Sequence, residues 1–160
     1  MKRLLNAVVA VLLALAVTAL VVPSAGANQW YPGQMQNGYW GWCLQGSWTD
    51  VQTYPCNSNY DVQDWWHIPS GVATARLYNI GADGCLNGDT SRMYLNYPCA
   101  NGAGWSLLYI TGSGSAFLVQ SKYNPNYCMA APWWNGGKPI MVTPCNAGYS
   151  DQRWYFGDFG

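Results

Sequence analysis

Six cysteines fall into three pairs that recur along the chain, and a tryptophan follows each pair. The three copies read WCLQGSWTDVQTYPC, GCLNGDTSRMYLNYPC and YCMAAPWWNGGKPIMVTPC. Their first cysteines, Cys43, Cys85 and Cys128, are 42 and 43 residues apart. A constant period of this size indicates an internal repeat, in which each unit buries its apolar face against its neighbours.

The repeat also predicts the disulfide pairing. Six cysteines permit 15 pairings, and spacing alone does not choose among them. Because every unit carries its own pair, the most economical pairing lies within units: Cys43–Cys56, Cys85–Cys99 and Cys128–Cys145. Each bridge closes a loop of roughly 14–18 residues, which contributes about 3 kcal/mol in the chain-entropy model.

Within each unit the sequence favours short β-strands. Residues 51–54, 93–97 and 140–143 are β-prone runs bounded by Gly, Pro and Asn, without a sustained helical period between them. A propeller blade has a similar period, but a propeller needs about four to eight blades. We therefore expect a closed threefold arrangement of four-stranded units. The repeats are expected at about 35–70, 72–111 and 115–160.

The first 27 residues have the pattern of a secretory signal peptide. Lys2 and Arg3 precede an apolar run over 4–22, and small residues at 25–27 provide a cleavage site. Retention of the long apolar run as a membrane anchor is the alternative. No later stretch approaches the roughly 20 residues of a membrane span. We expect a secreted, extracellular chain comprising residues 28–160, with an oxidising environment in which the disulfides form.

Charge and residue chemistry narrow the function. Without Lys2 and Arg3 the chain has five basic residues against seven aspartates, and it has no basic stripe, so a nucleic-acid partner is not expected. No metal-ligand spacing is present, and we predict neither a metal nor a cofactor.

The same residues argue against catalysis. His67 is the only histidine, and it follows a tryptophan pair at a predicted strand. The candidates for a catalytic carboxylate pair are Asp61, Asp64 and Asp151. Glycoside hydrolysis, however, needs two carboxylates about 5–10 Å apart in a cleft. The sequence shows no such cleft, and we expect no enzyme.

Three in-register copies of a cysteine pair and a tryptophan carry a resemblance to a known family. Gln63-Asp64-Trp65 and Gln152-Arg153-Trp154 follow Pro-Cys in the first and third units, and Ala103-Gly104-Trp105 is a degenerate copy. The chain from about residue 35 onward resembles the ricin B-type lectins with their Gln-x-Trp repeats. The resemblance implies an all-β fold: a β-trefoil of three four-stranded units with intra-repeat disulfides.

The tryptophans and the glutamines of this pattern have different predicted roles. Trp65, Trp105 and Trp154 are predicted to fill a shared threefold core, since each indole buries on the order of 200 Å². Gln63 and Gln152 are predicted to bind backbone groups of the adjoining turns.

The resemblance also implies a shallow sugar pocket on each unit. The family uses an acidic residue two after the first cysteine, an aromatic residue before Pro-Cys, and nearby amides. The residues at these positions here are, in the first unit, Gln45, Gln52, Tyr54 and Gln63, and in the second, Asn87 and Tyr97. Leu95 replaces an amide in the second unit, and Ala130 and Thr143 leave the third without a predicted site. An amide in place of the carboxylate should weaken binding about tenfold.

More tryptophans are present than a small core requires. They either cover the ends of the barrel or form an exposed patch for a partner, membrane or glycan. The candidates are Trp40, Trp48, Trp66, Trp133 and Trp134.

The main expectation is a non-catalytic carbohydrate-binding protein whose partners are glycans. The stretch LYNIGADGCLNGD also resembles a repeat opening in the cell-binding subunits of cytolethal distending toxins. The alternative is therefore a cell-binding or adaptor subunit that assembles with a separate catalytic or scaffold chain. A β-trefoil protease inhibitor is a third, less favoured interpretation.

Overall fold

The structure is a computed structural model that describes residues 32–48, 50–71, 74–99, 104–109 and 115–159. The predicted signal peptide, residues 1–27, lies outside the described residues. Among the residues that are described, no helix has the length and apolar character to cross a membrane.

Within the described residues, twelve strands and three short 3-10 helices form three successive units. The first contains β1 (Gly33–Asn37), β2 (Trp42–Ser47), β3 (Asp50–Pro55), η1 (Asp61–Gln63) and β4 (Asp64–Gly71). The second contains β5 (Thr74–Asn79), β6 (Gly84–Gly88), β7 (Met93–Asn96) and β8 (Trp105–Tyr109). The third contains β9 (Phe117–Ser121), β10 (Cys128–Ala130), η3 (Trp133–Asn135), β11 (Ile140–Val142), η4 (Ser150–Gln152) and β12 (Trp154–Gly157).

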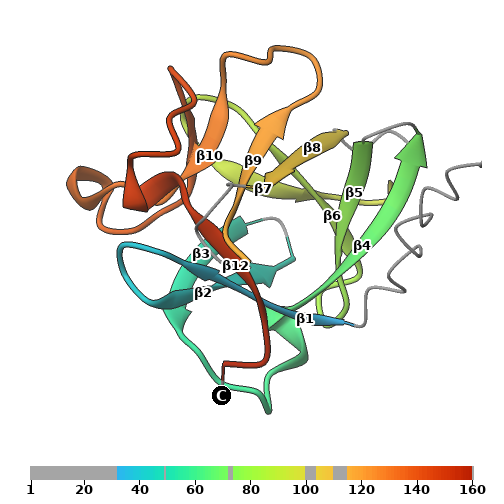
Figure 1. Cartoon of the computed structure of the whole chain (residues 1–160). Helices are drawn as coiled ribbons and strands as arrows, with labels where there is room; N and C mark the ends of the chain where they lie inside the picture. Colours follow the sequence, from blue (N-terminus) through green and yellow to red (C-terminus); the bar gives the residue numbers. More distant parts are fainter. Residues whose placement is uncertain (1–31, 49, 72–73, 100–103, 110–114, 160) are drawn as a thin grey trace, which may run out of the picture.

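Six of the strands close a barrel (Figure 1). Strand β1 pairs with β4 and β12, β5 pairs with β4 and β8, and β9 pairs with β8 and β12, always antiparallel. The remaining strands form the hairpins β2–β3, β6–β7 and β10–β11, each attached to the barrel strand that precedes it. The predicted all-β trefoil of three four-stranded units is confirmed.

One tryptophan from each unit fills the centre of the barrel. Trp65, Trp105 and Trp154 are almost completely buried in one apolar cluster. Their indole N–H groups donate to the carbonyls of Leu44, Leu86 and Met129, at 2.8, 3.1 and 3.1 Å. Each acceptor directly follows the first cysteine of its unit, so the three units repeat one contact.

The disulfides have the predicted pairing within units. Their Cα–Cα distances are 4.9 Å for Cys43–Cys56, 5.2 Å for Cys85–Cys99 and 5.1 Å for Cys128–Cys145. Each bridge joins the first strand of a hairpin to the chain just after its second strand. Each bridge therefore closes the base of its hairpin, while strand pairing attaches the hairpin to the barrel.

Candidate functional site

The outer face of the β2–β3 hairpin carries a row of polar and aromatic side chains. Gln45 and Gln52 stand opposite each other in the strand register, and Tyr54 lies two residues further along the same face. The Tyr54 hydroxyl donates to Gln52 Oε1 at 3.3 Å, and Gln52 Nε2 donates to Asp50 Oδ2 at 2.6 Å. Tyr54 remains exposed. Three predicted sugar-binding residues are thus brought together, and Asp50 joins them.

Gln63 does not lie on this surface. It is fully buried, and its amide is surrounded by protein partners. Its Oε1 accepts from Asn57 N–H at 2.8 Å and from Gln34 Nε2 at 3.1 Å. Its Nε2 donates to Pro55 O at 3.1 Å and to Gln45 Oε1 at 3.2 Å. These bonds leave no free donor or acceptor for a ligand, so the predicted sugar contact from Gln63 is corrected to a structural role.

Gln152 has the same structural role in the third unit. Its Oε1 accepts from Asn146 N–H at 2.8 Å, and its Nε2 donates to Pro144 O at 3.1 Å. Gln63 and Gln152 therefore bind equivalent backbone groups around the second cysteine of each unit. The predicted contact with turn backbone is present at both residues.

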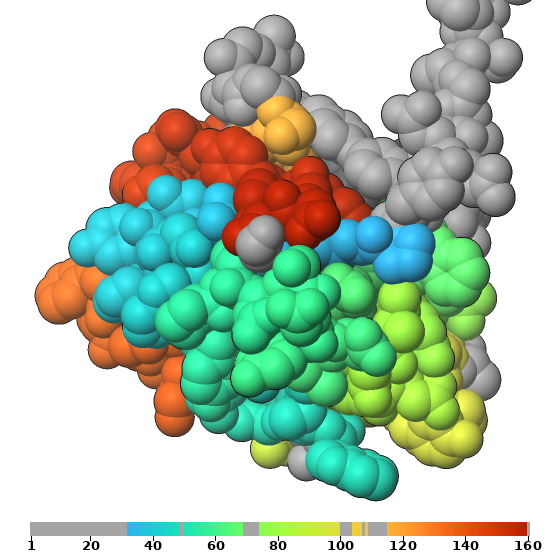
Figure 2. Space-filling view, turned by 90° about the horizontal axis from the view of Figure 1, so that it is seen from below, coloured from blue at the N-terminus to red at the C-terminus, as the bar shows by residue number. Residues whose placement is uncertain are grey.

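A hollow of about 390 Å³ lies beside the hairpin, between the first and second units. We call it the first hollow. Its lining includes Gln45 and Trp48 from the hairpin, Val62 from η1, and Asp83 from the β5–β6 turn. Trp48 is 90% exposed, and the turquoise hairpin tip projects from the surface in Figure 2.

Asp83 was not predicted, although it places a carboxylate in the hollow. It belongs to the next unit, and its Oδ1 accepts a 2.6 Å hydrogen bond from the Tyr78 hydroxyl. This bond, assisted by burial, raises the pKa of Tyr78. Counting from a cysteine within one repeat does not find Asp83, because the contact crosses from one unit to the next.

The second unit differs from its predicted pattern in register. Tyr94, and not Leu95, stands opposite Asn87, while Leu95 faces the core opposite Leu86. The expected substitution of Leu95 for an amide is therefore wrong. One additional residue, Tyr97, separates β7 from Pro-Cys, and this residue is 77% exposed.

Charge and hydrogen bonds further distinguish the second hairpin. The Arg92 guanidinium lies over the Tyr94 ring, 5.4 Å from its centroid. Asn87 Oδ1 accepts from the N–H of the adjacent Gly88 at 2.9 Å. Asn87 and Tyr97 consequently do not reproduce the cross-strand amide pair of the first unit.

In the third unit the equivalent hairpin face is apolar. Ala130 pairs with Ile140 and is buried, and Val142 takes the strand position of Tyr54. A second hollow of about 440 Å³ nevertheless lies at the junction of the third and first units. We call it the third hollow, because most of its lining residues belong to the third unit. Its lining includes Tyr39, Trp133, Trp134, Tyr149, Ser150 and Asp151.

The two hollows occupy equivalent places in the trefoil. Trp48 and Trp133 each lie five residues after the first cysteine of their unit, and Val62 and Asp151 each precede the buried glutamine. A buried asparagine closes each junction. Asn79 Nδ2 donates to Val62 O, and Asn37 Nδ2 donates to Asp151 O, both at 2.8 Å.

The predicted aromatic patch separates into exposed and half-buried members. Trp48, Trp66, Trp133 and Trp134 are exposed. Trp40 is half-buried and stacks on Trp42 with ring centroids 5.1 Å apart, and its Nε1–H donates to Ala131 O at 2.8 Å. Trp40 therefore contacts the third unit and is not part of the exposed aromatic surface.

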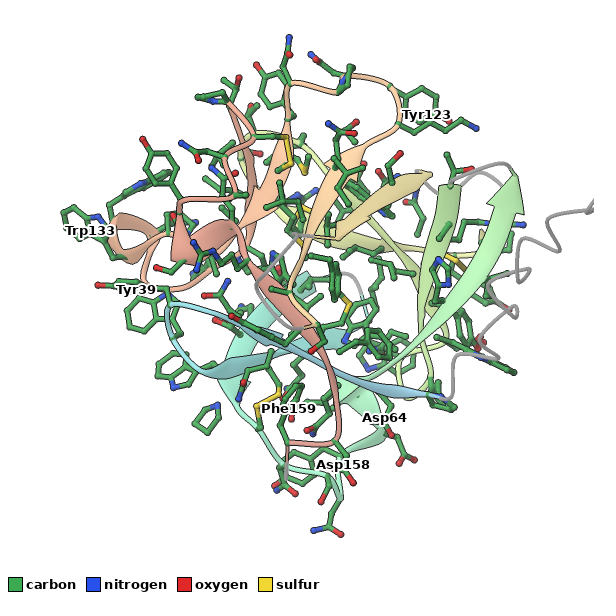
Figure 3. The ribbon with its side chains drawn as sticks, viewed as in Figure 1. Tyr39, Asp64, Tyr123, Trp133, Asp158 and Phe159 are labelled. Atoms are coloured by element: carbon green, nitrogen blue, oxygen red, sulfur yellow. A yellow bond between two sulfur atoms is a disulfide. The ribbon has the colours of Figure 1, made fainter. Side chains whose placement is uncertain are left out.

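The groups with shifted pKa values are distributed over the three units and are not collected in one hollow. Burial, followed by the carboxylates of Asp61 and Asp158, raises the pKa of Asp64, and Figure 3 shows Asp64 and Asp158 on the same side of the molecule. Burial also raises the pKa of Asp151, in the third unit, and lowers that of His67 on β4. Within the described ranges, no three His, Cys, Asp or Glu side chains are arranged to hold a metal.

Comparisons with known proteins identify the fold. No family model matches the chain, and no curated protein sequence matches it. The structure is similar to a designed threefold symmetric protein, ThreeFoil, with a TM-score of 0.63 and 17% identity, over 79% of this chain and 98% of that one. It is also similar to a Macrolepiota procera ricin B-like lectin in complex with lactose (TM-score 0.64, 16% identity, 80% of this chain and 95% of that one).

A third similar structure belongs to a much larger protein. This is a mosquitocidal holotoxin, matched with a TM-score of 0.65 and 15% identity over 79% of this chain. The match spans 16% of the holotoxin chain. Identities this low establish architecture alone. The chain is a β-trefoil of the kind found in a ricin B-like lectin.

Proposed function

We propose that the protein is a secreted, non-catalytic carbohydrate-binding protein that recognises cell-surface or polysaccharide glycans. The observation that carries the proposal is the composition of the first hollow and the adjoining hairpin face. An aromatic ring, an amide and a carboxylate converge there from two units: Trp48, Gln45 and Asp83. The neighbouring Gln52 and Tyr54 extend the same surface along β3.

These residue types match the chemistry of a sugar. A pyranose ring has an apolar face of C–H groups that lies on an aromatic ring, and hydroxyls that need fixed donors and acceptors. Tyr54 supplies such a ring, while Gln45 and Gln52 are held in place by the bonds already described. Restrained side chains lose less conformational entropy when a ligand binds. Three disulfides are also consistent with the proposed export.

We expect a weak site at the first hollow. A dissociation constant around 1 mM corresponds to about −4 kcal/mol. Useful attachment to a cell or polymer would then require several sites or several copies, which raise the effective concentration of the second contact.

The test is a glycan array, followed by titration of the best glycan against two variants with opposite expected effects. Tyr54→Ala should weaken binding about tenfold by removing the stacking surface, a loss of ~1.4 kcal/mol. Gln45→Asp should strengthen binding about tenfold, because a hydrogen bond to a carboxylate contributes about 1.4 kcal/mol more than one to an amide.

Tyr123→Ala is the matched control. Tyr123 is an exposed tyrosine of the β9–β10 loop that lines neither hollow, and its loss should leave binding unchanged. Equal binding by wild type and Tyr54→Ala would remove the first-unit site. A wild-type protein that binds no glycan on the array would overturn the proposed function itself.

A second candidate function is a cell-binding or adaptor subunit of a multi-chain toxin. Its support is the set of exposed tryptophans, which a protein partner could cover, together with the occurrence of this fold within a mosquitocidal holotoxin. Purification from the native source distinguishes the two functions. A stoichiometric second chain favours the subunit, and a lone monomer favours the free lectin.

A further inference from the structure

The third hollow has a lining unlike that of the first. Tyr39, Trp133, Trp134 and Tyr149 all line it, and each of these side chains is more than half exposed. In Figure 3, Tyr39 and Trp133 lie next to each other on one side of the molecule, although one comes from the first unit and the other from the third. Large aromatic side chains gathered on an open surface indicate a binding site.

The loop that presents the two tryptophans is fixed at both ends. At its start, Ala131 O accepts from Trp40 Nε1, and Ala131 N–H donates to Asp151 O at 2.9 Å. At its end, Gly137 O accepts from the Thr53 hydroxyl at 2.7 Å. Gly137 has a φ of +79°, and a Cβ there would lie 2.9 Å from Thr53 Oγ1 and 3.2 Å from Trp40 Nε1.

This anchoring matters because it comes from the first unit. Trp40 and Thr53 of the first unit bind the two ends of the third unit's loop, and Trp133 and Trp134 between these ends are exposed. Figure 2 shows the orange third-unit segment against the cyan first-unit segment. A preorganised aromatic surface binds a ligand with less entropic cost than a mobile one.

The polar groups of the third hollow are few and of mixed charge. Ser150 and Asp151 line it, while Arg153 is bound beside it, with Nε donating to Ala147 O at 2.7 Å. A carboxylate and a guanidinium so placed favour neither a strongly cationic nor a strongly anionic ligand. The volume of about 440 Å³ is within the roughly 300–1,000 Å³ of small-molecule sites.

We propose that the third hollow is a second glycan site that binds β-linked, all-equatorial pyranoses of the glucose type, chiefly by stacking. Such sugars carry their axial C–H groups on both ring faces and are therefore flat and apolar on each side. Several aromatic rings can stack on these apolar faces. A single ring with a pair of amides is instead suited to binding individual hydroxyl groups. The proposal deepens the carbohydrate-binding function, on which it rests.

The test titrates the full mature chain with cellotetraose by calorimetry. The double variant Trp133→Ala/Trp134→Ala should weaken cellotetraose binding at least tenfold, and Tyr39→Ala severalfold. Tyr123→Ala, in which another exposed aromatic side chain is removed, should bind like wild type. Unchanged melting temperatures, expected because the substituted rings are exposed, verify that the variants are folded.

The outcomes separate this inference from the proposed function. Cellotetraose binding that is lost with Trp133 and Trp134 but retained in Tyr54→Ala supports the third hollow. If cellotetraose binds wild type and the double variant equally, or if the array shows only Tyr54-dependent glycans, the inference fails while the lectin function stands. If no glycan binds wild type, both fail.

Discussion

The first and third hollows share a backbone and differ in chemistry. Each lies where two units meet, beneath a hairpin tip with a tryptophan five residues after a cysteine. The first has an amide and a carboxylate at Gln45 and Asp83, whereas the third has aromatic rings from both units. The comparison teaches that the trefoil fixes where the hollows lie, while a few loop residues decide the chemistry of their lining.

The shared backbone depends on buried contacts that the loops do not alter. The tryptophan-to-carbonyl bond recurs in all three units, and the buried asparagine bond recurs at the two junctions that carry the hollows. Substitutions in these buried groups should therefore act on stability. Substitutions in the loops should act on binding.

The largest effect is expected from the central tryptophans. Trp65→Ala, Trp105→Ala and Trp154→Ala should each lower the free energy of unfolding by about 3–5 kcal/mol, measured by denaturant titration with the disulfides intact. Similar losses at the three residues are expected, because the environments are equivalent. A small loss at one residue would contradict that equivalence. Trp134→Ala should change stability by less than about 0.5 kcal/mol.

An intermediate effect should distinguish the two buried glutamines. In the described part of the chain, Gln63→Leu leaves four groups without the hydrogen bond that they make to this glutamine. Gln152→Leu leaves two such groups. Because each buried unpaired group costs about 1–3 kcal/mol, partly relieved by water, we expect losses of about 3 and 2 kcal/mol. Chemical unfolding measures both. Equal losses would show that the bonds from Gln63 to Gln34 and Gln45 contribute nothing to stability.

The smallest effect concerns pH. The folded pKa values of Asp64 and Asp151 lie above the ordinary 3.8, so ionising these carboxyls opposes folding as pH rises, and the cost vanishes below about pH 3.8. Asp64→Asn and Asp151→Asn should each raise the melting temperature at about pH 7 and leave it unchanged at about pH 3.

Salt separates these two aspartates. Asp61 and Asp158 repel Asp64, whereas no other carboxylate contributes to the shift at Asp151. About 1 M salt screens exposed charges and should therefore reduce the stabilisation by Asp64→Asn more than that by Asp151→Asn. Thermal unfolding at low and high salt measures the difference. The same salt response in both variants would assign both shifts to burial alone.

The repeat made most of the fold predictable. Cysteine pairs and central tryptophans recur at a fixed period, and a residue that must fill the same core position in each unit leaves a visible pattern. The register of the second hairpin was not predictable in this way. Alignment on Pro-Cys equates Tyr97 with Tyr54, but the strand is paired from the first cysteine, and the additional residue falls after the strand.

The sites were less predictable than the fold, for a related reason. Trp40 and Trp133 both occur near glycines, and only contacts from distant parts of the chain decide that Trp40 is covered and Trp133 is open. Asp83 and Tyr39 reach hollows that adjoin another unit's hairpin. A pattern read within one repeat contains no information about a contact that crosses to the next.

Tyr39 and Asp83 have a consequence for how the molecule holds together. Because each hollow is lined by residues of two units, a ligand bound in either one would contact both units and hold them together. A ligand that binds only when the two units are packed together stabilises that packed state by RT ln(1 + [L]/Kd). Saturating sugar should then slow hydrogen exchange at the boundaries between units, where β4 pairs with β5 and β12 pairs with β1, before it slows exchange inside any unit.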